Sequence, residues 1–100
     1  MIDEDVVCIV RYLVKGVRPD RSEQGDLQNE LIDLLPNAKT ITILPVVDGY
    51  SVEIEMRDMA PFTRTSFEPY LAEHVIPEAV SIRCQSKGEV SLQLLKAHYA

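Results

Sequence analysis

The chain has 100 residues, of which 46% are hydrophobic and 26% are charged. This is the size of one ordinary domain, and the composition is typical of a chain that buries a core. The net charge of −6 argues against a nucleic-acid partner, because phosphate binding needs a basic face. No apolar run is long enough to span a membrane, and the first residues lack the basic segment of a secretory signal. We therefore expect a single domain over residues 1–100, located in the cytoplasm.

The two cysteines, Cys8 and Cys84, are too far apart for a CxxC motif and too few for a disulfide scaffold. We expect two reduced, buried thiols, which lie close together if their strands are neighbours. No metal-ligand spacing and no nucleotide-binding loop is present, so we expect no metal and no cofactor.

The first half of the chain begins with a predicted strand and a predicted helix. Residues 6–14 are largely apolar or β-branched at both odd and even positions, which predicts a central strand covered on both faces. Asp20 and Glu23 have the spacing of a capping box. The helix that they open is expected to run to about Leu35 and to end before Pro36.

A β-hairpin follows, because the dipeptide Asp48-Gly49 separates two runs of alternating apolar and polar residues. This pattern predicts a type I′ turn with both residues in the loop, and it pairs Ile43 with Ile54. Pro45 has no N–H to donate, which favours an edge strand.

Ser66 is expected to cap a second helix that ends before Pro77. Alternating residues then predict a closing hairpin of two strands, 79–86 and 89–96, with a three-residue loop that ends at Gly88.

The expected fold is α+β, because the order is strand, helix, two strands, helix, two strands. It corresponds to a ferredoxin-like βαββαβ sandwich with an additional C-terminal edge strand. The antiparallel sheet has the order 2-3-1-4-5 and carries both helices on one face. The alternative is an α+β roll in which the last hairpin is detached.

The histidines are the first candidates for chemistry. The helical spacing places His74 among the apolar residues of the second helix, and no carboxylate or hydroxyl is placed to act as its partner. We expect His74 to be a buried core histidine and His98 to lie exposed in the C-terminal tail.

Lys15, Arg18 and Arg21 form a basic segment just before the first expected helix. Together with the N-terminus of that helix, they are a possible anion loop.

Residues 14–18 resemble the glycine-containing phosphate loop of acylphosphatases, small enzymes with the same order of strands and helices. The resemblance extends to the Asp48-Gly49 hairpin and implies phosphate binding. The family places an arginine where this chain has Asp20, and an asparagine near the second strand, whereas positions 40–47 contain none. We therefore do not expect that activity.

Two surfaces are candidates for binding a partner. Glu23, Asp26, Glu30 and Asp33 lie along one side of the first helix, as a solvated face or as a docking surface for a basic partner.

The second surface is the sheet face away from the helices, where the first strand places Val7, Ile9 and Leu13, with Leu44 and Leu95 beside them. An exposed apolar band of this kind marks a partner site, unless the C-terminal tail or the 57–65 loop covers it.

The expected function is a non-enzymatic protein-protein interaction or regulatory module that acts through the open sheet face, the acidic helix or both. A narrower form is an inhibitor of a partner protein. The expected partner is a protein, first of all a second copy of this chain in a homodimer, with no nucleic acid and no membrane. The alternative is a small-molecule-binding or small enzyme domain of the dimeric ferredoxin-like type, with a pocket near His74 and Tyr12.

Overall fold

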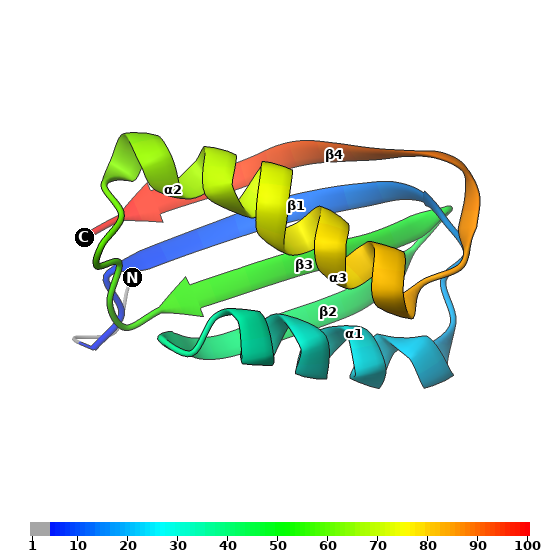
Figure 1. Ribbon diagram of the computed structural model, residues 1–100, viewed down its shortest axis with the longest axis horizontal. Coiled ribbons are helices and arrows are strands. Elements are labelled where there is room, and N and C mark those ends of the chain that lie inside the picture. The colour runs from blue at the N-terminus through cyan, green and yellow to red at the C-terminus, as the bar shows by residue number, and fades with distance from the viewer. Residues whose placement is uncertain (1–4) are drawn as a thin grey trace.

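The computed structural model describes residues 5–100, apart from the side chains of residues 86 and 87. Its elements are, in chain order, strand β1 (Cys8–Val17), helix α1 (Arg21–Leu34), strands β2 (Ala38–Val46) and β3 (Gly49–Met56), helix α2 (Arg64–Tyr70), the π-helical turn η1 (Leu71–Val75), helix α3 (Ile76–Arg83) and strand β4 (Ser86–Tyr99). The strands form an antiparallel sheet in the order β2-β3-β1-β4 (Figure 1). The predicted α+β class is confirmed.

Both helical segments lie in front of the same face of the sheet in Figure 1. Tyr12 and Tyr50 project from that face, since Tyr50 pairs directly with Val14, two residues along β1 from Tyr12. The Tyr50 hydroxyl accepts a hydrogen bond from the Asp20 amide at the start of α1 (2.8 Å). The Tyr12 hydroxyl donates one to the Glu68 carbonyl of α2 (3.1 Å). The two tyrosines therefore tie one helix each to the sheet.

Strand β1 occupies the position that its apolar sequence predicted, between β3 and β4. Its helix-facing side chains, among them Val10 and Val14, are fully buried. Val17 is also buried, although it is at an odd position of β1 and regular alternation would direct it to the open face of the sheet. Gly16, with a φ of 89°, lies at an irregularity in the pairing with β4 and allows this change of face.

The β2–β3 hairpin has the predicted buried face, but its predicted register is wrong. Ile43 pairs with Val52, and Ile41 pairs with Ile54, so the strands are displaced by two residues from the expected pairing. Because side chains alternate with a period of two, Ile43 and Ile54 still share the buried face.

The displacement moves Gly49 out of the loop and into β3. The loop consists of Val47 and Asp48, and of these two only Asp48 has a positive φ, at 62°, which excludes a type I′ turn. Gly49 pairs with Lys15 of β1, and a Cβ atom added to it would lie 1.7 Å from the Val14 carbonyl oxygen. The close approach of β1 therefore requires this glycine.

The second helical segment continues through Pro77, contrary to the prediction. Thr63, not Ser66, caps its start, and the Thr63 side chain accepts a hydrogen bond from the Ser66 amide. In the wider turn η1, the Ile76 amide bonds to the Leu71 carbonyl, five residues earlier. Pro77 then lies in the first turn of α3, where its missing N–H is tolerated.

The predicted strand over 79–86, the closing hairpin and the fifth strand are wrong. Helix α3 occupies 76–83 and buries Ile76, Ala79 and Val80, which have helical spacing. A single strand, β4, follows and pairs directly with β1. Among the described residues, β4 is therefore an edge of the sheet, and β2, with Pro45, is the other edge, as predicted.

Candidate functional site

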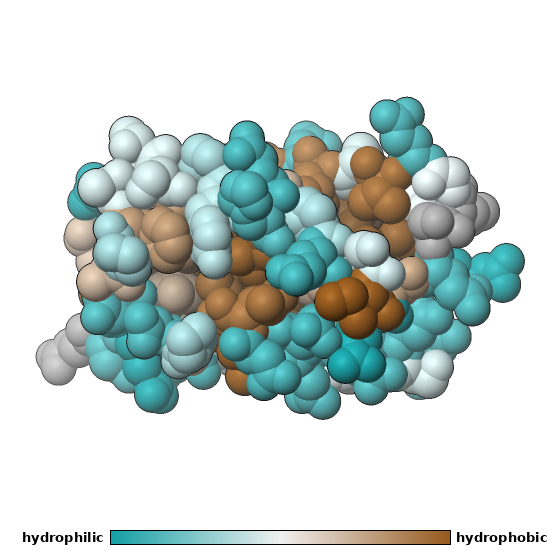
Figure 2. All heavy atoms as spheres, viewed as in Figure 1, coloured by the Kyte–Doolittle hydropathy of each residue, from teal (hydrophilic) through white to brown (hydrophobic). Residues whose placement is uncertain are grey.

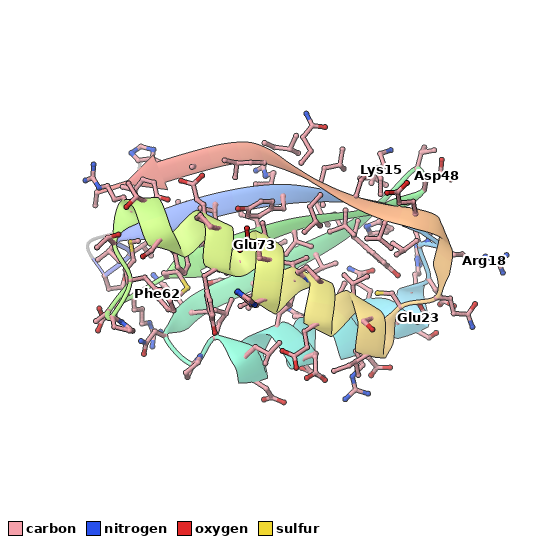
Figure 3. All side chains as sticks on the ribbon, turned by 45° about the horizontal axis from the view of Figure 1, so that its top comes forward. Lys15, Arg18, Glu23, Asp48, Phe62 and Glu73 are labelled. Carbon is pink, nitrogen blue, oxygen red and sulfur yellow. The ribbon has the colours of Figure 1, made fainter. Side chains whose placement is uncertain are left out.

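The three basic residues before α1 do not form a common anion site. The Lys15 ammonium group donates a hydrogen bond to the Val47 carbonyl (2.6 Å) at the hairpin loop. Figure 3 shows Lys15 near Asp48, whereas Arg18 extends outward at one end of the molecule. Arg21 is the first residue of α1 and is exposed.

The N-terminus of α1 already holds a carboxylate from its own chain. The Asp20 side chain accepts hydrogen bonds from the Ser22 hydroxyl and amide, both at 2.8 Å. These bonds lower the pKa of Asp20 below its usual value. The carboxylate occupies the place where an external anion would bind.

The acidic residues of α1 face in two directions. The Glu30 carboxylate accepts a hydrogen bond from Arg83 of α3 (2.9 Å), and so joins the two helices. Glu23 is half-buried, whereas Asp26 and Asp33 are exposed. The expected acidic face therefore contributes part of its charge to the contact with α3.

The two cysteines are free thiols, and they lie at opposite ends of β1. Cys8 is the first residue of β1, and Cys84 follows α3. The neighbour of Cys84, Gln85, accepts a hydrogen bond through its carbonyl from the Arg18 amide (3.2 Å). Because Arg18 directly follows β1, this bond places Cys84 near the other end of that strand. The expectation that they lie close together is wrong. Cys8 is buried, as predicted, but Cys84 is half-buried, and burial raises the pKa of each thiol to about 11.

His74 is exposed, so the prediction of a core histidine is wrong. It lies in η1, whose wider turn changes the phase of the helix and directs Val75 and Ile76 into the core instead. The His74 ring lies 5.8 Å from that of Tyr70. His98 is exposed as expected, but it belongs to β4 and pairs with Ile9.

Of the residues expected on the open face of the sheet, Ile9 and Leu13 belong to β1, whereas Val7 precedes the strand and packs against the hydrophobic core. Val7, Ile9 and Leu13 are half-buried. Leu44 and Leu95 are 57% and 47% exposed, and they lie on the two edge strands, β2 and β4.

A central ion pair interrupts this apolar face. The Arg11 guanidinium lies 2.7 Å from the Glu53 carboxylate, on residues that pair directly between β1 and β3. The pair separates Ile9 from Leu13 along the strand. The predicted residues therefore do not form a continuous apolar band, since the ion pair separates Ile9 from Leu13 and Leu95 lies where the pairing of β4 with β1 shifts.

The more continuous apolar surface lies on the helix side of β4. Leu92 and Leu94 pair with buried residues of β1, Val14 and Tyr12 respectively, so their side chains face the helices. Leu94 is nevertheless 41% exposed, and Val90 is 37% exposed. Figure 1 shows the cause, since the second helical segment runs diagonally away from β4 toward α1.

An open groove of about 570 Å³ lies where α3 diverges from β4. Its walls include Pro77, Val80, Ser81 and Cys84 on one side and Val90 and Leu92 on the other. Figure 2 shows apolar surface exposed along this part of the molecule. A second depression, of about 650 Å³, shares Ala72 and Leu92 with it and reaches Tyr12.

Sequence reasoning missed this surface because it paired 89–96 with the strand wrongly predicted over 79–86. The alternation of Val90, Leu92 and Leu94 was visible. Only the helical state of 76–83 shows that these residues have no covering strand.

The described residues provide no group of three or more His, Cys, Asp or Glu side chains able to hold a metal ion. No helix in the described range has both the length and the apolar composition needed to cross a bilayer. In comparisons with known proteins, no family model and no curated protein matches this chain.

Proposed function

We propose that this chain is a non-enzymatic protein-interaction module that binds an extended polypeptide segment along the edge of β4. The observation that carries the proposal is a 14-residue edge strand with exposed apolar side chains beside an open groove. An edge strand presents backbone N–H and C=O groups that a further strand can pair with. Adjacent pockets then select alternate side chains of that strand.

The contrast between the two sheet edges supports β4 as the binding edge. Strand β2 has only nine residues and contains Pro45, which has no N–H to donate to a further strand. Strand β4 has 14 residues and no proline, and its pairing with β1 is regular over Ser91–Leu94, between irregularities at Leu95 and over residues 86–91.

We propose further that the domain is of the ferredoxin-like type. Support comes from the order of strands and helices and from the sheet order, which read from the other edge is β4-β1-β3-β2. In this arrangement the open sheet face adjoins β4, whereas the exposed acids of α1 lie near β2, at the opposite edge, and form a separate contact surface.

A second candidate is an apolar small-molecule site in the same groove. The groove volume of about 570 Å³ lies in the range of known ligand pockets, and most of the residues that line it have apolar side chains. Tyr12 lines the neighbouring depression and not this groove, and His74 lines neither of them.

The proposed function is tested by affinity capture from the native host with the wild-type chain and two variants. Leu94→Lys places a charge on the β4 edge, whereas Leu44→Lys makes the same change on β2 and serves as the control. Protein partners should be lost with Leu94→Lys and retained with Leu44→Lys, and partner binding should slow amide hydrogen exchange over 88–95. Equal capture by all three chains contradicts the proposal.

A further inference from the structure

We infer that a small pocket between the end of α1, the end of β3 and α2 binds an alkylated ammonium group. The pocket has a volume of about 200 Å³. This is below the roughly 300–1,000 Å³ of pockets for drug-sized ligands, so the pocket suits a compact group. No β4 residue is among the described residues that line it, and the inference therefore does not depend on the proposed function.

Segments far apart in the sequence meet at this pocket. Leu34 and Leu35 come from the C-terminal end of α1, Met56 ends β3 and Tyr70 ends α2. Figure 1 shows the end of α1 and the loop between β3 and α2 at the same end of the molecule. Phe62 belongs to that loop and lies at that end in Figure 3.

Three aromatic rings line the pocket and contact one another. The ring of Phe62 stacks on that of Tyr70, with centroids 4.4 Å apart. The ring of Phe67 lies 5.9 Å from that of Phe62, at an angle of 47°. The face of an aromatic ring attracts a cation within about 6 Å of its centre. Because the rings are tilted relative to one another, they can surround a cationic group on more than one side.

Two negative features adjoin these rings. Asp58 lines the pocket, and its carboxylate is held in place because it accepts a hydrogen bond from the Ala60 amide (2.9 Å). Helix α1 ends at Leu34, and its last turn contains no basic residue that would offset the partial negative charge of the helix C-terminus. The carboxylate, the helix end and the ring faces all favour a positively charged ligand.

The arginines of the adjoining segments contact other groups. Arg57 follows β3, and its guanidinium lies 3.9 Å from the Asp5 carboxylate. Arg64 begins α2, lies over the Tyr99 ring of β4 at 5.3 Å from its centroid, and donates a hydrogen bond to the Ala100 carbonyl (3.1 Å). Within the described part of the chain, no lysine, arginine or histidine lines the pocket. A ligand cation would therefore have no competing side chain there.

The lining favours an alkylated ammonium group over a primary one. A primary ammonium group carries three N–H donors, and each needs an acceptor. Among the described lining residues, only Asn37, Asp58 and Tyr70 have polar side chains, and Asp58 already accepts a bond from the Ala60 amide. A quaternary ammonium group has no N–H to satisfy, and its methyl groups can contact the ring faces directly.

The first experiment titrates the chain with choline and follows the ring resonances of Phe62 and Tyr70 by NMR. Choline should bind with a dissociation constant of about 1 mM or below. Dimethylbutanol, which has a carbon in place of the choline nitrogen, should bind about tenfold more weakly because it has the same shape without the charge. Methylammonium should also bind about tenfold more weakly, because its N–H donors lack acceptors.

The same titration with an acetylated trimethyllysine amide distinguishes two sources of this chemistry. Tighter binding of the trimethyllysine compound than of choline assigns the pocket to a modified side chain of another protein. Tighter binding of choline assigns it to a free small molecule.

Two pairs of variants test whether binding occurs in this pocket. Tyr70→Leu removes a ring and should weaken choline binding about tenfold, whereas Tyr70→Phe keeps the ring and should change it by less than about twofold. Asp58→Asn removes the charge but keeps an acceptor for the Ala60 amide, and should weaken binding about threefold. Asp26→Asn, on an exposed residue of α1 that does not line the pocket, should have no effect. Circular dichroism checks folding, and Phe62→Leu replaces Tyr70→Leu if that variant does not fold.

The outcomes that would overturn the inference are distinct from those that test β4. Ring resonances that do not shift with choline overturn it, and equal binding of choline and dimethylbutanol overturns the choice of a cation. Equal weakening by Asp58→Asn and Asp26→Asn indicates general attraction to an acidic chain, and also overturns the pocket. Leu94→Lys should bind choline as the wild-type chain does, so a failure at either site leaves the other proposal standing.

Discussion

Adding one methyl group to Gly49 tests the close approach of β1 to β3. In Gly49→Ala the new Cβ would lie 1.7 Å from the Val14 carbonyl oxygen and 2.8 Å from its carbon. Both atoms belong to the backbone of β1, so no side-chain rotation relieves the overlap. We expect a loss of about 3 kcal/mol in the free energy of unfolding, the upper part of the range for overpacked interiors.

Gly25→Ala is the matched control, with the opposite expected sign. Gly25 lies within α1, is exposed, and an added Cβ would meet nothing within 4 Å. Removing the conformational freedom of a helical glycine should raise the free energy of unfolding by about 0.5–1 kcal/mol.

Urea unfolding followed by circular dichroism measures both changes, with the slope of the transition as a check that the unfolded states are comparable. A Gly49→Ala variant within about 0.5 kcal/mol of the wild type would refute the close approach of β1 and β3 at this point.

Three further predictions concern the loop, the thiols and the helix contact. Asp48→Val should lower the free energy of unfolding by about 1 kcal/mol more than Asp48→Asn in urea titrations, because residue 48 has a φ of 62°, which β-branched residues disfavour. The free energy of unfolding should fall as the pH rises from 9 toward 11. Burial in the folded chain raises the pKa of Cys8 and Cys84 from 9.0 to about 11. The thiols of the unfolded chain therefore lose their protons at lower pH, which favours unfolding. Urea titrations at several pH values measure this decline, and an equally steep decline in the Cys8→Ala/Cys84→Ala variant would contradict the assignment. Glu30→Gln should lower the free energy of unfolding by about 0.5 kcal/mol at low salt and by less at high salt, because the ion pair of Glu30 with Arg83 is partly exposed. A decrease that does not depend on salt would argue against the ion pair.

Local sequence signals predicted the elements whose cause is local. The alternation over 40–56 predicted the buried face of the β2–β3 hairpin, and Asp20 predicted the start of α1. These signals act between residues close in the chain, through side-chain alternation and capping hydrogen bonds. The apolar side chains of β1 on the open face were predicted for the same reason.

The register of the hairpin depended on a contact far away in the sequence. Asp48-Gly49 has the composition of a type I′ turn, but Gly49 lies in β3 because β1 approaches it closely at Val14. No pattern within residues 40–56 contains that information, because the partner is 35 residues away.

The composition of residues 76–83 was compatible with both a strand and a helix. Val80 and Ile82 alternate as in a strand, whereas Ile76, Ala79 and Val80 have the spacing of a helix face. The choice depends on packing, since the helical form buries Ile76, Ala79 and Val80 and joins Arg83 to Glu30 of α1.

The same choice determined which surface is available to a partner. With 76–83 in a helix, β4 has no outer neighbour among the described strands, and Val90 and Leu94 remain exposed beside the groove. The sequence by itself determined the α+β class, the central strand and the faces of the hairpin, because alternation and capping act locally. Only the tertiary structure decided where the sheet ends, because an edge is defined by which segment packs elsewhere.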